Sequence, residues 1–221
     1  MSNTATKLED SSVEQVVIYI RNSIVSGEFS PNTKLRPNKI ADQCGTSFIP
    51  VREAMRVLES EGLITYIHNR GAFVTSISKS DLQDLYSIRI ELEPTTVAIS
   101  NPFTPGEIAE LAKILSKIDK ARELGADSHI IQLNQEFHFG IYKKSNSPRR
   151  IRLIEQLWSH ADRYQRLSLQ YRHDAAASEH QEILNHLSLG NNVAAAHSLS
   201  SHLKTTATLL TAAFDGNKNC L

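Results

Sequence analysis

The sequence of 221 residues has only two cysteines, no long apolar run and no excess of charge of either sign. Cys44 and Cys220 lie far apart, without the short spacing of a metal or redox motif, which is typical of a reducing compartment. Nowhere do about 18 apolar residues follow one another, so a membrane-spanning helix is excluded. The first dozen residues are polar, so we expect no signal peptide. These absences together predict a cytoplasmic protein without a membrane partner.

Charge and composition exclude other classes of protein. The 24 lysines and arginines balance the 24 aspartates and glutamates, and the net charge is zero. A protein that binds nucleic acid through an overall basic field is therefore excluded, and any such binding must be local. A hydrophobic content of 40% and a charged content of 22% are ordinary for a globular protein with one large or two small domains.

Glycine and proline divide the chain into two halves. Up to about Thr75 the pattern mixes helices with a short strand pair, whereas beyond "SISKS" (76–80) both residues are sparse and the pattern is helical. The helical period of the second half predicts an antiparallel all-α bundle. Its expected helices span roughly 80–99, 104–124, 127–145, 148–170, 175–189 and 192–213. The expected divisions are a disordered tail over 1–10, a first domain over 11–76, a linker over 77–80, a second domain over 81–214 and a tail over 215–221.

The stretch "SFIPVREAMRVLESEGLI" (47–64) predicts a helix with two faces. Ser47 can cap its N-terminus, and a proline in the first turn costs little because those amides have no partner within the helix. Arg52 and Arg56 lie one turn apart on a face away from the apolar stripe. The stripe expected to be buried comprises Val51, Ala54, Met55 and Leu58.

Two helical segments precede this helix, and "LITYIHNRGAFVT" (63–75) follows it with two short strands around a turn. Three helices and a β-hairpin are the elements of a winged helix-turn-helix, whose third helix lies in the major groove of DNA. Arg52 then suits a bidentate contact to guanine, while Arg56 and Lys39 suit phosphates. The alternative is a solvated face on which the arginines pair with Glu53 or Glu59.

Histidine is the unusual feature of the second half, which contains eight of the nine in the chain. Asn134 and His138 share a helix face, and His180 and His202 lie on two other predicted helices. Neutral imidazoles converging from three helices would suit zinc or another divalent metal, with a position left open for a ligand. The alternative is that each is an ordinary surface or hydrogen-bonded core residue. We expect this ordinary role for His129, His160, His173, His186 and His197.

Arg89 lies between Leu85 and Leu92 on the inward side of its predicted helix. A guanidinium in that position needs an anion. Either Glu93, one turn on, supplies it within the chain, or Arg89 clamps the carboxylate of a ligand. A metal and an arginine together would bind a small organic acid.

The stretch "PNTKL…IADQCGTSFIPVREAMRVLESEGLI…NRGAFV" resembles the DNA-binding domain of the GntR superfamily, in the branch with a FadR-type C-terminal (FCD) domain. The sequence differs at Asn32, where the family usually has glycine, at Pro37, where it often has an acidic residue, and at Phe48, where a base-reading arginine is common. The resemblance implies a homodimer that binds an inverted repeat in double-stranded operator DNA. The residues expected at that interface are Arg36, Lys39, Ser47, Phe48, Arg52, Arg56 and Arg70.

The second domain resembles an FCD domain in the order of its histidine motifs. That family commonly has Asp–x–x–x–His, then Glu–His, then His–Leu, and this chain has Asn134–x–x–x–His138, Glu179–His180 and His202–Leu203. The resemblance implies a divalent metal, zinc or nickel, held at partial occupancy because the neutral Asn134 replaces an aspartate. The implied ligands are Asn134, His138, His180 and His202.

"RIELE" (89–93) resembles the FCD element whose arginine, here Arg89, faces the effector cavity. Together these features predict a ligand-responsive transcriptional repressor that senses a small carboxylate effector through a metal-assisted pocket. The alternative from another class is a metal-dependent hydrolase or lyase that uses the three histidines. Against it, no carboxylate is placed as a general base near them, and a fused DNA-binding domain would have no purpose. A third possibility is a regulator whose pocket has become a structural core.

Overall fold

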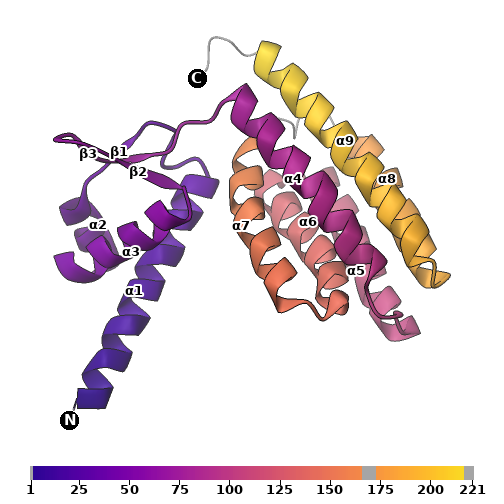
Figure 1. Cartoon of the computed structure of the whole chain (residues 1–221), viewed down its shortest axis with the longest axis horizontal. Coiled ribbons are helices and arrows are strands. Elements are labelled where there is room, and N and C mark those ends of the chain that lie inside the picture. The colour runs from indigo at the N-terminus through magenta and orange to yellow at the C-terminus, as the bar shows by residue number, and fades with distance from the viewer. Residues whose placement is uncertain (1, 166–172, 217–221) are drawn as a thin grey trace. The chain divides into compact units, whose positions relative to one another are not determined.

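The computed structural model describes residues 2–165 and 173–216, and the chain divides into two compact units between Ile77 and Ser78 (Figure 1). The first unit is mixed helix and strand, and the second is helical. This confirms the predicted fold class of a winged helix-turn-helix followed by an all-α bundle. In the described residues, no helix has both the length and the apolar character that crossing a membrane requires.

The first unit contains three helices and a small antiparallel sheet with the strand order β1-β3-β2 (Figure 1). The predicted hairpin is confirmed, because β2 and β3 pair around the turn at 68–70. The strand β1 was not predicted, since two residues carry no periodic signal. The elements are α1 (Ser2–Val25), β1 (Lys34–Leu35), α2 (Pro37–Cys44), α3 (Phe48–Ser60), β2 (Ile64–Ile67) and β3 (Gly71–Val74).

The core of this unit lies between α1 and α3, and the predicted stripe of α3 is fully buried in it. Gly45 ends α2 with a φ of 62°, and this left-handed residue makes the tight turn into α3. Asn32 has a φ of 64°, so it adopts a conformation that favours the glycine usual there in the family. Ser47 is the residue before α3 as predicted, but its side chain makes no capping hydrogen bond.

The ends of the two units differ from the sequence prediction. The helix α1 begins at Ser2, although residues 1–10 were predicted as a disordered tail; the segment contains no glycine or proline to end the helix. The helix α4 begins at Lys79, inside the predicted linker 77–80, because the hydroxyl of Ser78 caps it by accepting from the Asp81 amide at 3.1 Å. The last helix extends to Gly216, and residues 217–221 lie outside the described part of the chain.

Within its described residues, the second unit consists of the six predicted helices and one 3₁₀ turn. Figure 1 shows α4 running beside α9, and α4 packs on α9 and α7, while α5 packs on α6 and α8. A capping box formed by Thr104 and Glu107 begins α5. The predicted extension of the fourth helix to residue 170 lies outside the described residues. The helices are α4 (Lys79–Ala98), α5 (Pro105–Glu123), α6 (Asp127–Tyr142), η1 (Lys143–Ser145), α7 (Pro148–Gln165), α8 (His173–Ser188) and α9 (Asn192–Gly216).

Candidate metal centre and DNA-facing residues

Three histidines from three helices meet inside the second unit. His138 on α6, His180 on α8 and His202 on α9 are 1%, 4% and 6% exposed. Each offers a ring nitrogen, and these nitrogens all lie within 4.8 Å of one another. The convergence predicted from the sequence is therefore present. A surface location is wrong for all three, whereas the alternative of hydrogen-bonded core residues also fits them.

One pair of these nitrogens has the spacing of two ligands on a metal ion. The Nε2 atoms of His138 and His180 are 3.2 Å apart. Two nitrogens bound at about 2.0–2.1 Å to a tetrahedral zinc are separated by about 3.3 Å. His202 contacts Oε2 of Glu179 through Nδ1 at 2.8 Å, which leaves its Nε2 as the nitrogen for a metal. A carboxylate behind a ligating histidine is a common arrangement in metal sites. The residues present therefore fit a divalent metal.

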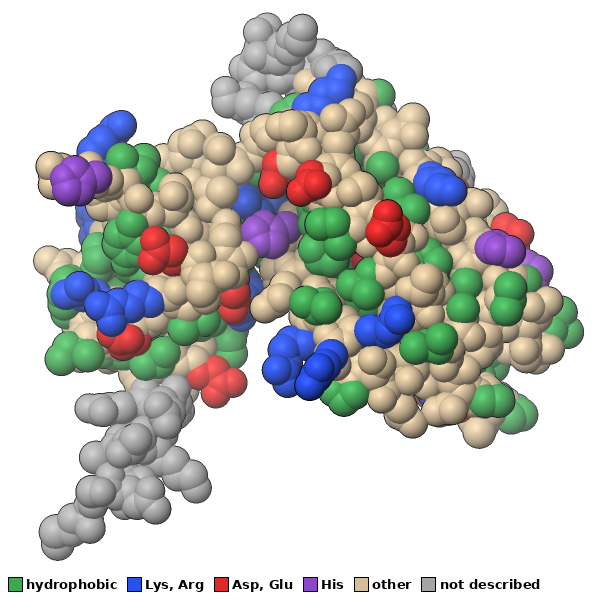
Figure 2. All heavy atoms as spheres, viewed as in Figure 1, with side chains coloured by type: hydrophobic (Ala, Val, Ile, Leu, Met, Phe, Trp, Pro, Cys, Tyr) green, Lys and Arg blue, Asp and Glu red, His purple; other side chains and the backbone are tan. Residues whose placement is uncertain are grey.

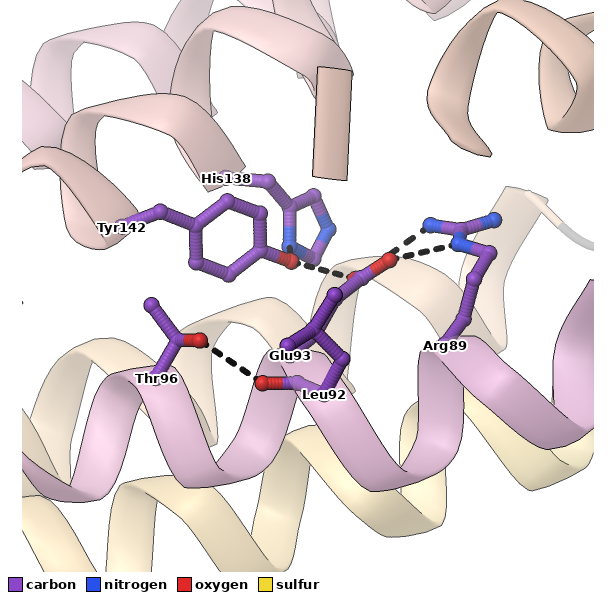
Figure 3. Close-up of polar contacts among 6 residues, drawn as sticks. All are labelled: Arg89, Leu92, Glu93, Thr96, His138 and Tyr142. Atoms are coloured by element: carbon purple, nitrogen blue, oxygen red, sulfur yellow. Dashed lines mark hydrogen bonds and ion pairs between the residues drawn. The ribbon is translucent and has the colours of Figure 1, made fainter. Parts of the chain in front are cut away.

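A buried polar network joins this cluster to Arg89. Glu93 lies between Arg89 and Tyr142, as Figure 3 shows. Arg89 donates to the Glu93 carboxylate from Nε at 2.6 Å and from Nη2 at 3.3 Å. The hydroxyl of Tyr142 donates to Oε2 of the same carboxylate, the oxygen that Nη2 also contacts, at 2.6 Å and lies 3.2 Å from Nδ1 of His138. The partner of Arg89 within the chain is thus Glu93, the first of the two partners left open by the sequence.

The network fixes where the protons lie. Burial and the Glu93 charge raise the pKa of Tyr142 well above its ordinary value, so the phenol stays protonated. Burial alone would lower the pKa of Arg89, but the Glu93 carboxylate outweighs burial and raises it. Since the Tyr142 hydrogen goes to Glu93, its oxygen accepts from Nδ1 of His138. In its neutral form, His138 then presents an unprotonated Nε2, which is the form that binds a metal.

Two further residues of α7 lie by this network and were missed by the sequence reasoning. The indole of Trp158 packs against the guanidinium of Arg89, with 4.7 Å from Cζ to the ring centroid, and against His138, with 5.3 Å between centroids. Asp162, one turn later, is 6% exposed, and burial raises its pKa to about 7, partly offset by the charge of Arg89. Neither residue belongs to a recognisable motif. The only signal in the sequence is that Trp158 and Asp162 are four residues apart, which places them on one face of the helix.

The remaining predicted ligand lies in a suitable place. Asn134 lies one turn before His138 on α6 and is half-buried, so it stays a prediction as the fourth ligand. Among the histidines expected to be ordinary, His197 is exposed, and His186 lies 3.7 Å from Glu182 on the same helix. The side chain of His173 lies outside the described residues.

The residues predicted to contact DNA are all exposed on the first unit. Figure 2 shows lysine and arginine side chains beside exposed hydrophobic ones on this unit. Arg56 pairs with Glu53 at 3.0 Å on the surface, while the guanidinium of Arg52 lies over the Phe48 ring, 5.7 Å from its centroid. An exposed ion pair is worth less than about 1 kcal/mol, so it does not prevent Arg56 from reaching a phosphate.

Comparison with known proteins matches both units to families. Residues 12–74 match the family described as bacterial regulatory proteins, gntR family, and residues 84–205 match the FCD domain. The sequence is 30% identical over 187 residues to the uncharacterized HTH-type transcriptional regulator YdhC of Bacillus subtilis, covering 83% of this chain and 84% of that protein.

Two regulators of Escherichia coli are also similar. The HTH-type transcriptional regulator McbR is 34% identical over 145 residues, which cover 65% of this chain and 66% of McbR. A solved structure of McbR superimposes with a TM-score of 0.81 at 27% identity, over 90% of this chain and 96% of that one. The HTH-type transcriptional repressor GlaR is 27% identical over 90% of this chain and 96% of its own length. These relatives are regulators, and they give no support to the hydrolase or lyase alternative.

Proposed function

The chain belongs to the GntR family of bacterial regulatory proteins with an FCD domain, and we propose that this DNA-binding regulator senses a small carboxylate with its helical unit. As a homodimer in the cytoplasm, it binds an inverted repeat through two copies of α3. Two recognition helices must stand about one DNA turn apart, roughly 34 Å, which one chain cannot supply. We infer repression, the role named for the relative GlaR, with the effector releasing the operator.

The observation that carries this proposal is the hydrogen-bonded path from the histidine cluster to Arg89. Successive hydrogen bonds link Arg89 to Glu93, Glu93 to Tyr142, and Tyr142 to His138, a predicted metal ligand. The groups proposed to bind a carboxylate and those proposed to bind a metal are therefore parts of a single buried network. A ligand bound at one end changes the environment of the other.

Charge in this network explains why a metal is needed. Glu93 already neutralises Arg89, because both side chains are buried and paired at 2.6 Å. An added carboxylate would bring an unbalanced negative charge into a buried site, at a cost of several kcal/mol. A divalent metal held by His138, His180 and His202 would supply positive charge and an open coordination position for the effector.

The unengaged polar atoms indicate how the effector is held. Within the described residues, Nη1 of Arg89 and Nε1 of Trp158 have no hydrogen-bond partner. Both are donors, so both suit the oxygens of a carboxylate. Because Glu93 occupies the Nε edge of Arg89, the guanidinium offers only Nη1 rather than the full bidentate clamp. An effector with a hydroxyl or carbonyl next to its carboxylate would reach the metal as well.

Trp158, the single tryptophan of the chain, provides the test. Its ring contacts both Arg89 and His138, so its fluorescence should respond to events at either end of the network. We would titrate the dialysed protein with zinc or nickel, and then with a panel of hydroxy- and keto-carboxylates. Each compound that changes the fluorescence is then added to a gel-shift assay with promoter DNA.

Matched variants separate the parts of the proposal. His180→Ala should remove the metal response, whereas His197→Ala, an exposed histidine on the same helix as His202, should leave it intact. Arg89→Lys keeps the charge that balances Glu93 but loses Nη1, so it should keep the metal and lose carboxylate affinity. A protein whose fluorescence and DNA affinity respond to no carboxylate in the metal-loaded state would contradict the sensor proposal.

A further inference from the structure

Two large apolar side chains begin the recognition helix and are not part of any core. Phe48 is 45% exposed and Ile49 is 72% exposed, and they are the first two residues of α3. The buried stripe of the same helix lies on its other side and begins only at Val51. The fold of the unit therefore does not require an aromatic ring at position 48.

The half-buried ring of Phe48 also contacts a cation. The guanidinium of Arg52, one turn later, lies over it at 5.7 Å from Cζ to the centroid, within the range of a cation–π contact. This contact orients both side chains at the N-terminal end of α3. The end of the helix thus presents an apolar group and a cation side by side.

The surroundings of Phe48 are basic. The ring lines an open hollow of about 620 Å³ between α2, α3 and the wing. The described residues around this hollow include four cations and no carboxylate. The cations are Lys34, Arg36, Lys39 and Arg70. A polyanion suits such a rim, whereas a neutral or basic surface would leave the four cations without opposite charge.

Only one apolar group is available to a protein in the major groove. Guanine presents O6 and N7, cytosine and adenine present amino groups, and thymine alone presents a methyl group, at C5. A phenyl ring has no donor for guanine, so Phe48 cannot replace the base-reading arginine common at this position. A phenyl ring does pack on a thymine methyl.

We propose that Phe48, with Ile49 beside it, contacts a thymine methyl group in each half of the operator. Thymine is selected at the position where an arginine would select guanine, and Arg52 reads the neighbouring base pair. This inference rests on the proposed placement of α3 in the major groove.

The experiment begins with the full-length protein and a library of random DNA duplexes, from which bound sequences are selected. Each enriched thymine is then replaced by deoxyuridine, which removes only the C5 methyl and keeps the base pair. Binding is measured by fluorescence anisotropy. We expect the affinity of the native protein to fall about fourfold for the methyl lost in one half-site, the effect of one methyl group removed from water.

Three variants complete the test. Phe48→Ala should bind the thymine and deoxyuridine duplexes equally, and Val57→Ala, an exposed apolar residue later in α3, should keep the native preference. Phe48→Arg should select guanine at the same position. Because these side chains are exposed, each variant should show the native circular dichroism and melting temperature.

The outcomes separate this inference from the function on which it rests. A native protein that selects a defined sequence but binds thymine and deoxyuridine equally at every position would overturn the role of Phe48 alone. The same conclusion follows if Phe48→Ala changes the oligomeric mass while its base preference stays native, since the ring would then serve a protein contact. Selection of no sequence at all would overturn sequence-specific DNA binding itself.

Discussion

Tyr142 donates a hydrogen bond of 2.6 Å to Glu93, and this bond joins the α6 histidine to the α4 arginine inside the helical unit. The same phenol oxygen lies 3.2 Å from Nδ1 of His138 (Figure 3). One hydroxyl therefore satisfies a buried carboxylate and orients a predicted metal ligand. Its removal should affect both stability and metal affinity.

Tyr142→Phe should lower the free energy of unfolding by about 1–3 kcal/mol, because Glu93 loses a buried hydrogen-bond donor. It should also weaken metal binding about 10- to 100-fold, because His138 loses the partner of Nδ1. Urea unfolding and a competitive zinc titration measure the two effects. Tyr164→Phe is the matched control, since Tyr164 bonds Asp81 and Ser78 at the start of α4 instead. Equal zinc affinities for the native and Tyr142→Phe proteins would contradict the proposal that His138 is a metal ligand.

Asp162→Asn should change how stability depends on pH. The pKa of Asp162 is raised from 3.8 to about 7, mainly by burial, so the folded protein holds this proton more tightly than the unfolded chain. Below about pH 4 Asp162 is protonated in both states and does not lower the free energy of unfolding. As pH rises to about 7, it lowers the free energy of unfolding by a growing amount. Asparagine does not ionise, so the variant lacks this pH-dependent loss of stability. Between pH 5 and 8 the stability of the variant relative to the native protein should rise by on the order of 2 kcal/mol, measured by urea unfolding. A constant difference over this range would show that Asp162 stays ionised.

Arg52→Ala and Arg56→Ala should have different effects on DNA binding. Arg52→Ala should cost about 1–3 kcal/mol at one operator position and relax the base preference there. Arg56→Ala should weaken binding to all sequences and lower the salt dependence by about one counterion. The control is Glu53→Gln, which frees Arg56 from its 3.0 Å ion pair and should not weaken binding. Binding measured on a set of single-base operator variants at several salt concentrations decides between the two roles.

The full-length protein should be a dimer joined mainly through the helical unit. Light scattering should give about twice the chain mass of 24.7 kDa at micromolar concentration. The segment 78–221 has its own buried core and should give a dimer as well. If the segment is a monomer while the full-length protein is a dimer, then the dimer interface lies in the first unit instead.

Asn134→Asp should tighten metal binding, because the carboxylate supplies the negative charge that the amide lacks. Metal content after dialysis should rise in this variant and fall to zero in His180→Ala. His197→Ala should match the native protein. If Asn134→Asp holds no more metal and His180→Ala loses none, then the three histidines only line a pocket for an organic anion.

The sequence by itself determined the types of element and their order. The apolar stripe from Val51 to Leu58, the glycine at position 45 and the hairpin turn at 68–70 act on neighbouring residues, so their effects are readable without the fold. The motif order also placed His138, His180 and His202 together, as the structure confirms. A local rule was wrong where the energy involved is small, as at the hydroxyl of Ser47, which makes no capping hydrogen bond.

Only the tertiary structure decided the partners of the buried charges. Arg89 was left with two possible anions by the sequence, and its pairing with Glu93 depends on the burial of both side chains in the bundle. The bond from Tyr142 to Glu93 and the burial of Asp162 depend on how α4, α6 and α7 pack, and no spacing along the chain encodes those distances. Electrostatic energy varies with the distance between charges and with burial, and both quantities exist only once the helices are packed.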